Sequence, residues 1–349
     1  MMSSSRNILL NLLAVGLLGL FLWWAEGNLT GYQVQIINLI AINTILALGL
    51  NLIYGFGGMF SLGHAGFMAI GAYTCALLIL PPLQKQMIFI LQPLRWPFSV
   101  MHAPFLVAVL LGGLVAAIFS ILVGIPILRL GGDYLGIATL GFAEIVRVVA
   151  NNIPSVTNGA LGIKGIPPYS NIWWNYGFLI IILYSMIKLI NSNYGNVLKA
   201  IRDDEIAAKA MGIDVFKYKI EAFAMGSFLA GIGGALQASF ITTIDPKMYM
   251  FTMTFNVLMM VVAGGLGSIS GTCIASAIIT ILLEWLRIVE NPLNLGPIHI
   301  PGIPGMRMVI FSLALIFIIL FRREGIMGMR ELTWDTILGF FGRAKGHAE

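Results

Sequence analysis

Long apolar segments separated by short polar ones occupy most of the chain, and this pattern predicts a membrane protein. A helix needs about 20 residues to cross the hydrocarbon layer, and a helix satisfies its own backbone hydrogen bonds there. Ten such segments lie at residues 8–24, 34–54, 61–80, 104–127, 134–152, 174–190, 220–243, 250–266, 268–289 and 305–321. The chain is therefore predicted to be an all-α, polytopic transmembrane helical bundle of about ten spans.

Two of these segments allow a second interpretation. Arg6 followed by the apolar run to residue 24 is typical of a signal peptide as well as of a first span. A retained span is favoured, because a succession of further spans follows. Residues 59–80 contain four helix-breaking or polar positions, namely Gly63, His64, Gly66 and Gly71. This segment is compatible with a broken or re-entrant element as well as with a simple helix.

One long polar segment, residues 191–219, interrupts the apolar pattern. Asp203 or Asp204 can cap a short helix there, and the negative charge of Glu205 favours its first turn. Gly212 stands where a left-handed residue would end that helix. The segment therefore predicts a helix of about two turns between two spans.

The predicted short helix has one small, apolar face. Glu205 and Lys209 stand four residues apart, a spacing that stabilises a helix by a few tenths of a kcal/mol. The apolar face comprises Ile206, Ala207, Ala210 and Met211. Such a face suits docking into a groove of a partner protein. A solvated loop helix without a partner is the alternative.

Composition excludes the soluble globular class. The chain is 58% hydrophobic and 10% charged, and its mean hydropathy is +0.92. A net charge of +5 is compatible with nucleic-acid binding, but the basic residues occupy short loops without interleaved aromatic side chains. The charge is therefore interpreted as a signal for membrane orientation, and no nucleic-acid partner is expected.

The distribution of basic residues predicts which side of the membrane each loop occupies. With the N-terminus inside, thirteen of the twenty basic residues face the cytoplasm and six face outward, while Arg147 lies within a span. The thirteen are Arg6, Arg129, Lys188, Lys199, Arg202, Lys209, Lys217, Lys219, Arg322, Arg323, Arg330, Arg343 and Lys345. Both termini and the polar segment 191–219 are predicted to be cytoplasmic. Residues 1–330 form the predicted transmembrane domain, and residues 331–349 form a cytoplasmic tail.

Common sequence motifs for catalysis are absent from the chain. The chain has no phosphate-binding loop, no HExxH zinc helix and no nucleophile elbow. No catalytic residue, metal site or cofactor is therefore assigned to it, and the chain is not expected to be an enzyme.

Charged residues within spans are costly and are candidates for function. Glu144, Arg147 and Asn151 share one face of the predicted helix 134–152. They are interpreted either as part of a translocation path or as a buried structural ion pair that holds two spans together. The structural interpretation is favoured, because a zwitterionic substrate would need both charges free.

The order Glu205, Ala207, Ala208, Gly212 resembles the EAA loop of ABC importer permeases, in the variant E-x-A-A-x-x-x-G of the LivM-type family. Further stretches are similar to the same family, namely Ser61–Tyr73, Asp133–Asn151, Gly159–Pro167 and Gly264–Ala277. The resemblance covers residues 40 to 325. Segments 57–61 and 264–268 are also weakly similar to each other. Gly57, Gly58 and Ser61 align with Gly264, Gly265 and Ser268, as a parallel internal repeat would require.

The resemblance implies a membrane subunit of a bacterial inner-membrane importer for branched-chain amino acids. Its expected partners are a second homologous permease, two cytoplasmic subunits that bind ATP and Mg²⁺, a periplasmic or lipid-anchored binding protein, and membrane lipid. In the family the segment around Glu205, Ala207, Ala208 and Gly212 couples to the ATPase. Arg202, Asp203 and Asp204 are expected to make polar contacts at the rim of that interface.

Other functions remain open from the sequence. An importer permease for urea or a short-chain amide resembles the same family in the same motifs. An ATP-independent secondary transporter is a third possibility, in which Glu144 and Arg147 form a proton or ion site.

Overall fold

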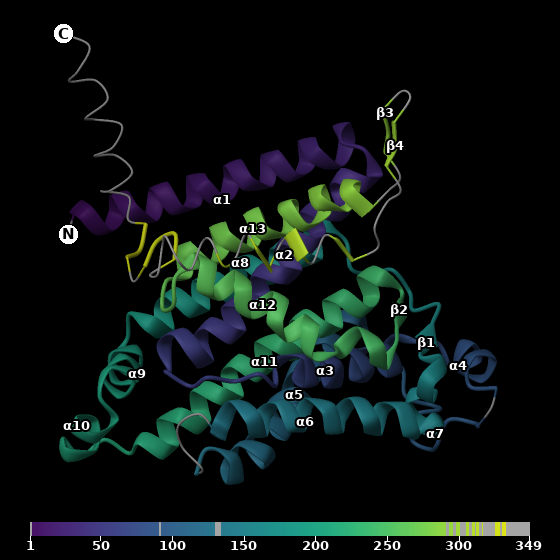
Figure 1. Cartoon of the computed structure of the whole chain (residues 1–349), viewed down its shortest axis with the longest axis horizontal. Coiled ribbons are helices and arrows are strands. Elements are labelled where there is room, and N and C mark those ends of the chain that lie inside the picture. The colour runs from purple at the N-terminus through teal and green to yellow at the C-terminus, as the bar shows by residue number, and fades with distance from the viewer. Residues whose placement is uncertain are drawn as a thin grey trace.

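The computed structural model describes residues 2–90, 92–129, 134–290, 293–295 and 298–300, and short stretches within 305–332. Within these residues the chain is an all-α bundle (Figure 1). This confirms the predicted fold class.

The helices are α1 (Met2–Asn28), α2 (Gly31–Asn51), a π-helical turn η1 (Leu52–Phe56), α3 (His64–Ile79), α4 (Pro82–Ile88), α5 (Phe105–Ile127), α6 (Tyr134–Asn152), α7 (Pro154–Thr157), α8 (Ile172–Ile190), α9 (Asn193–Asp203), α10 (Glu205–Ala210), α11 (Val215–Ile241), α12 (Phe251–Gly264) and α13 (Ile269–Trp285). Short 3₁₀ turns occupy Gly159–Leu161, Pro246–Tyr249 and Leu286–Glu290. Strands β1 (Ile163–Lys164) and β2 (Thr243–Ile244) form an antiparallel pair, as do β3 (Leu293–Leu295) and β4 (Ile298–Ile300).

Nine of the ten predicted spans coincide with helices, and the tenth, 305–321, lies mostly outside the described residues. Six of the described helices are long and apolar enough to cross a membrane. Helices α12 and α13 have 14 and 17 residues, so α12 extends only about 21 Å. The predicted number of ten spans is therefore approximate.

Segment 59–80 is broken rather than a simple span. Residues 58–63 are not helical, and α3 then runs for 16 residues from His64. At the other end of α3 the chain bends by 119° into α4.

Helix α11 lies at the centre of the bundle, where it packs against α2, α3 and α5. Three glycines allow α3, α5 and α11 to approach closely. A Cβ added to Gly231 would lie 2.7 Å from the Cβ of Ala116 and 2.8 Å from the carbonyl oxygen of Gly112. A Cβ added to Gly71 would clash directly with the backbone of Gly231. These positions accept no side chain without moving a helix backbone.

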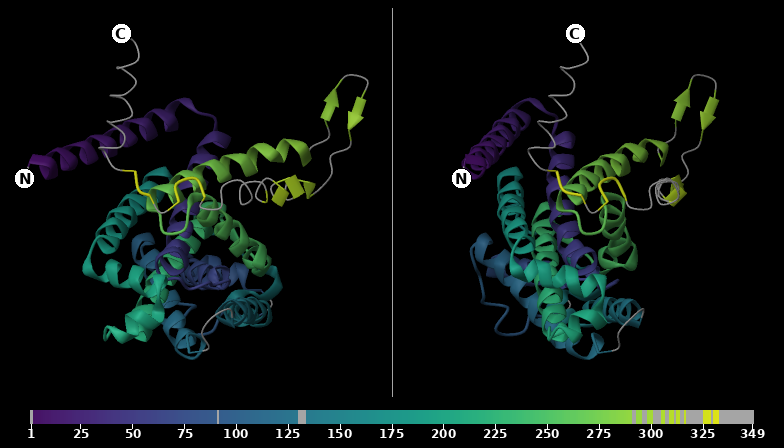
Figure 2. Two further views of the ribbon diagram at one scale, coloured as in Figure 1. Left: turned by 60° about the vertical axis from the view of Figure 1, so that its left-hand side comes forward. Right: turned by 90° about the vertical axis from the view of Figure 1, so that its left-hand side faces the viewer.

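The bundle has two distinct ends. Helices α9 and α10 lie at the end where α1 begins, and α4, α7, β1 and β2 lie at the opposite end (Figures 1 and 2). They are called the α10 end and the α4 end. At the α4 end the Lys85 ammonium is buried and donates to the carbonyl oxygen of Phe98 at 2.7 Å and to that of Met101. Its burial lowers the pKa of Lys85, and the two bonds tie the following loop to α4.

Helix α1 is peripheral. Leu22 and Ala25 are buried against the bundle, whereas most of the other described apolar side chains of α1 are exposed. The helix therefore presents an apolar surface suited to lipid contact.

Candidate functional site

The polar loop, residues 191–219, folds into α9, α10 and the first turn of α11 at the α10 end of the bundle. Asp204 separates α9 from α10. Its carboxylate accepts hydrogen bonds from the backbone N–H groups of Ile206, at 2.8 Å, and Ala207, at 3.0 Å. This confirms that an aspartate caps the predicted short helix and identifies it as Asp204.

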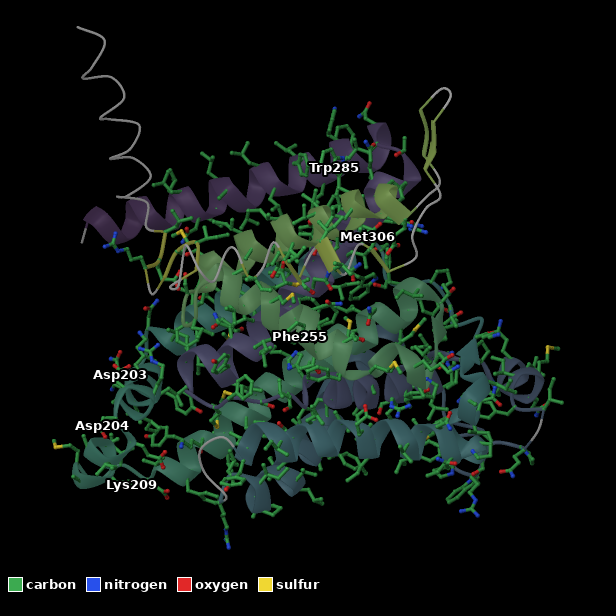
Figure 3. The ribbon with its side chains drawn as sticks, viewed as in Figure 1. Asp203, Asp204, Lys209, Phe255, Trp285 and Met306 are labelled. Atoms are coloured by element: carbon green, nitrogen blue, oxygen red, sulfur yellow. The ribbon has the colours of Figure 1, made fainter. Side chains whose placement is uncertain are left out.

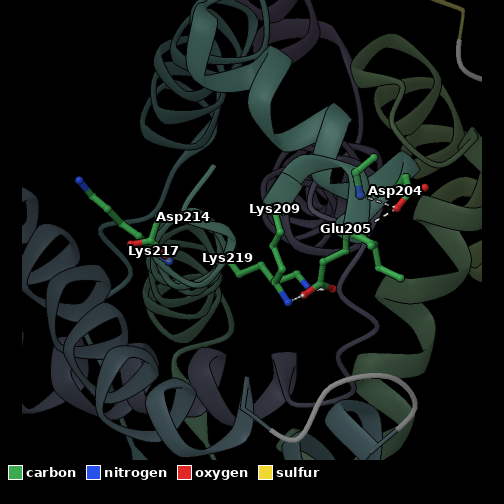
Figure 4. Close-up of polar contacts among 8 residues, drawn as sticks. Asp204, Glu205, Lys209, Asp214, Lys217 and Lys219 are labelled. Carbon is green, nitrogen blue, oxygen red and sulfur yellow. Dashed lines mark hydrogen bonds and ion pairs between the residues drawn. The ribbon is translucent and has the colours of Figure 1, made fainter. Parts of the chain in front are cut away.

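The end of α10 is set by Gly212, whose φ is +82°. Its N–H donates to the carbonyl oxygen of Lys209, and the N–H of Ile213 donates to that of Ala208. These bonds satisfy the last carbonyl groups of the helix. Asp214 then caps α11 by accepting from the N–H of Lys217 (Figure 4).

Glu205 lies between two lysines (Figure 4). One carboxylate oxygen lies 3.0 Å from the Lys209 ammonium, as the i, i+4 spacing predicts, and the other lies 2.5 Å from Lys219 in α11. The Lys219 ammonium is the main reason why the pKa of the Glu205 carboxyl lies below its usual value. The ion pair between Glu205 and Lys219 ties α10 to α11. The sequence did not predict the contact with Lys219, because 14 positions separate the two residues.

The polar loop has its own small apolar core. Ile201, Ala208 and Val215 are buried against one another, one from each of its three helices. Ala208, a predicted coupling residue, is therefore a packing residue within the loop. Ile206 and Met211, by contrast, are each 82% exposed.

The charged residues before and within α10 point in different directions. Asp203 is 66% exposed and projects at the edge of the molecule, as do Asp204 and Lys209 (Figure 3). Arg202 is only 20% exposed. Its guanidinium donates to Asp203 at 2.9 Å and, on the inner side, to the carbonyl oxygen of Gly55 at 3.1 Å. Arg202 therefore connects the loop to the bundle.

The Glu144–Arg147 ion pair lies on α6 alone. Its nitrogen and oxygen are 2.7 Å apart, and the two side chains are 39% and 28% exposed, respectively. Asn151 is exposed one turn later on the same helix. The predicted ion pair therefore forms, but within one helix. Among the described residues it joins no second helix, and in the single chain both side chains are partly exposed.

Comparison with known proteins identifies the family. Residues 32–320, more than four fifths of the chain, match the family described as the permease component of the branched-chain amino acid transport system. The chain belongs to this family.

The permease is 31% identical over 289 residues to the high-affinity branched-chain amino acid transport permease LivM of Salmonella typhimurium. The match covers 73% of the permease and 64% of that relative, so it spans somewhat less than two thirds of the relative's length. LivM of Escherichia coli is equally similar, at 31% identity with 73% and 63% covered. A probable LivM of Methanocaldococcus jannaschii is 25% identical, with 64% and 66% covered. No solved structure shows a significant match.

The structure also shows residues near the polar loop that sequence reasoning missed. The Glu331 carboxylate accepts from the N–H groups of Ile269 and Ser270, and so caps α13. Asn51, fully buried at the end of α2, bonds the backbone between α12 and α13. These contacts join positions more than 60 residues apart, so no local sequence pattern marks them.

Proposed function

We propose that this permease is one membrane subunit of an ATP-driven importer for branched-chain amino acids, and that the polar loop docks into a cytoplasmic ATPase subunit. The observation that supports this most directly is the form of α10. It is a short, capped helix at the extreme end of the bundle. Two large apolar side chains, one in the helix and one at its C-terminal cap, are exposed to solvent. Exposed Ile206 and Met211 gain stability by entering an apolar groove.

The construction of the loop suits the transmission of force. Its own core and the contacts of Glu205 with two lysines hold α9, α10 and the start of α11 together. A push on α10 would therefore move α9 and α11 as well. Because α11 is the central helix of the bundle, such a movement can alternate the access of a path between the two sides.

The exposed face of α6 suggests where the second permease subunit lies. Glu144, Arg147 and Asn151 stand on a helix that also exposes apolar residues, such as Ile145 and Val148. A charged pair facing hydrocarbon is unfavourable. We propose that this face turns toward a homologous second permease and the water-filled path between the two subunits.

The remaining assignments follow from family membership and complete the proposal. Two partner subunits bind and hydrolyse ATP with Mg²⁺, and a periplasmic or lipid-anchored protein delivers substrate to the α4 end. The protein resides in the inner membrane, with the α10 end in the cytoplasm. Branched-chain amino acids are proposed because the relatives are named as transporters of them.

The first experiment is purification in mild detergent from the native membrane, with mass spectrometry of the proteins that accompany the permease. We expect two ATPase subunits and a second permease. Replacement of Ile206 and Met211 by Glu should abolish recovery of the ATPases, because charged side chains cannot enter an apolar groove.

The matched control is Met87→Glu, at a methionine on α4 that is 74% exposed at the opposite end of the bundle. It should leave ATPase recovery unchanged. Recovery of the wild-type permease alone, in a preparation that still transports, would contradict the proposed function and favour an ATP-independent transporter.

A further inference from the structure

Two breaks in the helical structure meet at the α10 end. The first follows η1, where Gly58 has a φ of +67° and the chain is not helical until His64. The second is the turn between α12 and α13, where Gly265 and Gly267 have φ values of +112° and +83°. Glycine tolerates such angles with little strain, so both breaks can change conformation more readily than the flanking helices.

The second break is in direct contact with the helical residues that lead into the first break, Asn51 at the end of α2 and Gly55 in η1. The N–H of Gly267 donates to the Asn51 side chain at 3.0 Å, and the Asn51 amide donates to the carbonyl oxygen of Ser268 at 2.9 Å. A Cβ added to Gly55 would lie 2.5 Å from the nitrogen of Gly267. A movement of the second break would therefore displace η1, at whose end the first break begins.

Arg202 of the polar loop lies against both breaks. Its Nη1 donates to the carbonyl oxygen of Gly55 at 3.1 Å. A Cβ on Gly58 would meet the Cγ of Arg202 at 3.1 Å, and a Cβ on Gly267 would meet its Nη1 at 2.8 Å. The opposite edge of the guanidinium is held by Asp203. The planar side chain thus bridges the loop and the two glycine breaks.

Space for movement exists beside this contact. A cavity of about 610 Å³ is lined by Arg202, Gly267, Ser270 and Glu331, among others. The chain near residues 326–330 holds the second break: the N–H of Met327 donates to the carbonyl oxygen of Gly264, and the Ser268 hydroxyl donates to that of Arg330. The break is therefore anchored on one side and contacted by Arg202 on the other.

We propose that Arg202 is the positioning residue that transmits displacement of the polar loop to the two glycine breaks, and through them to α2, α12 and α13. The assignment rests on the proposed function, because it needs an ATPase to move the loop. It differs from the expected role of Arg202 at the rim of the ATPase interface: the guanidinium faces the bundle and is mostly buried.

The test uses the complete transporter, with its ATPase and binding-protein subunits, in proteoliposomes. Uptake of radiolabelled leucine and hydrolysis of ATP are measured on the same preparation, and their ratio is compared between wild type and Arg202→Met. We expect Arg202→Met to retain the ATPases and to hydrolyse ATP at close to the wild-type rate. The leucine imported per ATP should fall about tenfold, a size typical of coupling between two sites.

Arg202→Lys provides a second measurement, also valid if the methionine variant fails to assemble. A lysine can donate to Gly55 or to Asp203 but lacks the planar fork that holds both. We expect its ratio of leucine to ATP to lie between those of wild type and Arg202→Met. If the methionine variant does not assemble, the ratio of Arg202→Lys should lie below that of wild type. The control is Lys188→Met, which removes an exposed positive charge from the last turn of α8, outside the polar loop, and should keep the wild-type ratio.

The outcomes separate the two proposals. Absence of ATPases from the wild-type complex would contradict the proposed function itself. A wild-type ratio of leucine to ATP in Arg202→Met, or in Arg202→Lys if only that variant assembles, would overturn the role of Arg202 while leaving the importer intact. An equal fall in uptake and hydrolysis would also overturn it, because it would place Arg202 at the ATPase contact.

Discussion

At position 212 the backbone, and not the available space, determines which residue is tolerated. A Cβ on Gly212 would meet nothing within 4 Å, but the φ of +82° disfavours side chains branched at Cβ. We expect Gly212→Val to cost about 1–2 kcal/mol locally and to displace α10. ATP-driven uptake should be lost, while the amount of permease in the membrane should match wild type.

Gly212→Asn is the matched control for this prediction. Asparagine visits the left-handed conformation far more readily than valine, so this variant should transport. Normal uptake by Gly212→Val would show that the end of α10 does not contribute to coupling.

At the scale of elements, the close crossing of α3, α5 and α11 sets how the bundle packs. We expect Gly231→Ala to destabilise the permease by about 1–3 kcal/mol, as overpacking does in other cores. The added methyl group would lie 2.7 Å from the Cβ of Ala116 and 2.9 Å from the Cα of Gly113. A thermal unfolding scan in detergent should therefore give a lower Tm.

Gly177→Ala tests whether the effect comes from the crossing or from the loss of any helical glycine. Gly177 lies within α8, and an added Cβ there would meet nothing within 4 Å. Its Tm should equal or exceed that of wild type, because alanine favours helices more than glycine does. Equal Tm losses in both variants would contradict the packing explanation.

At the scale of the whole molecule, the face of α6 that carries Glu144 and Arg147 must be covered by protein or water. A cysteine at position 148, one turn from Glu144 and exposed in the single chain, probes that face. In a background without Cys75 and Cys273, we expect Val148→Cys to react with a membrane-impermeant maleimide in native membranes. The reaction should change when substrate and ATP are added.

Ile118→Cys provides the comparison, because Ile118 is 53% exposed on the apolar helix α5. A lipid-facing thiol stays protonated and out of reach of the reagent, so this variant should not react. Similar, slow labelling at both positions would mean that the face of α6 contacts lipid, and the second permease would then have to lie elsewhere.

The sequence alone determined the features that depend on local chemistry. Apolar length predicted the helices, and the spacing of Asp204, Glu205, Lys209 and Gly212 predicted the capped α10, because caps and i, i+4 pairs involve neighbours along the chain. The contacts of Arg202 with Gly55 and of Glu205 with Lys219 were decided only by the tertiary structure. They join residues distant in sequence, and their geometry depends on how closely glycine lets the helices approach. Helices α12 and α13 are short because the backbone between them, from Gly265 to Ser268, leaves the helical conformation. Hydropathy does not predict where such a break occurs.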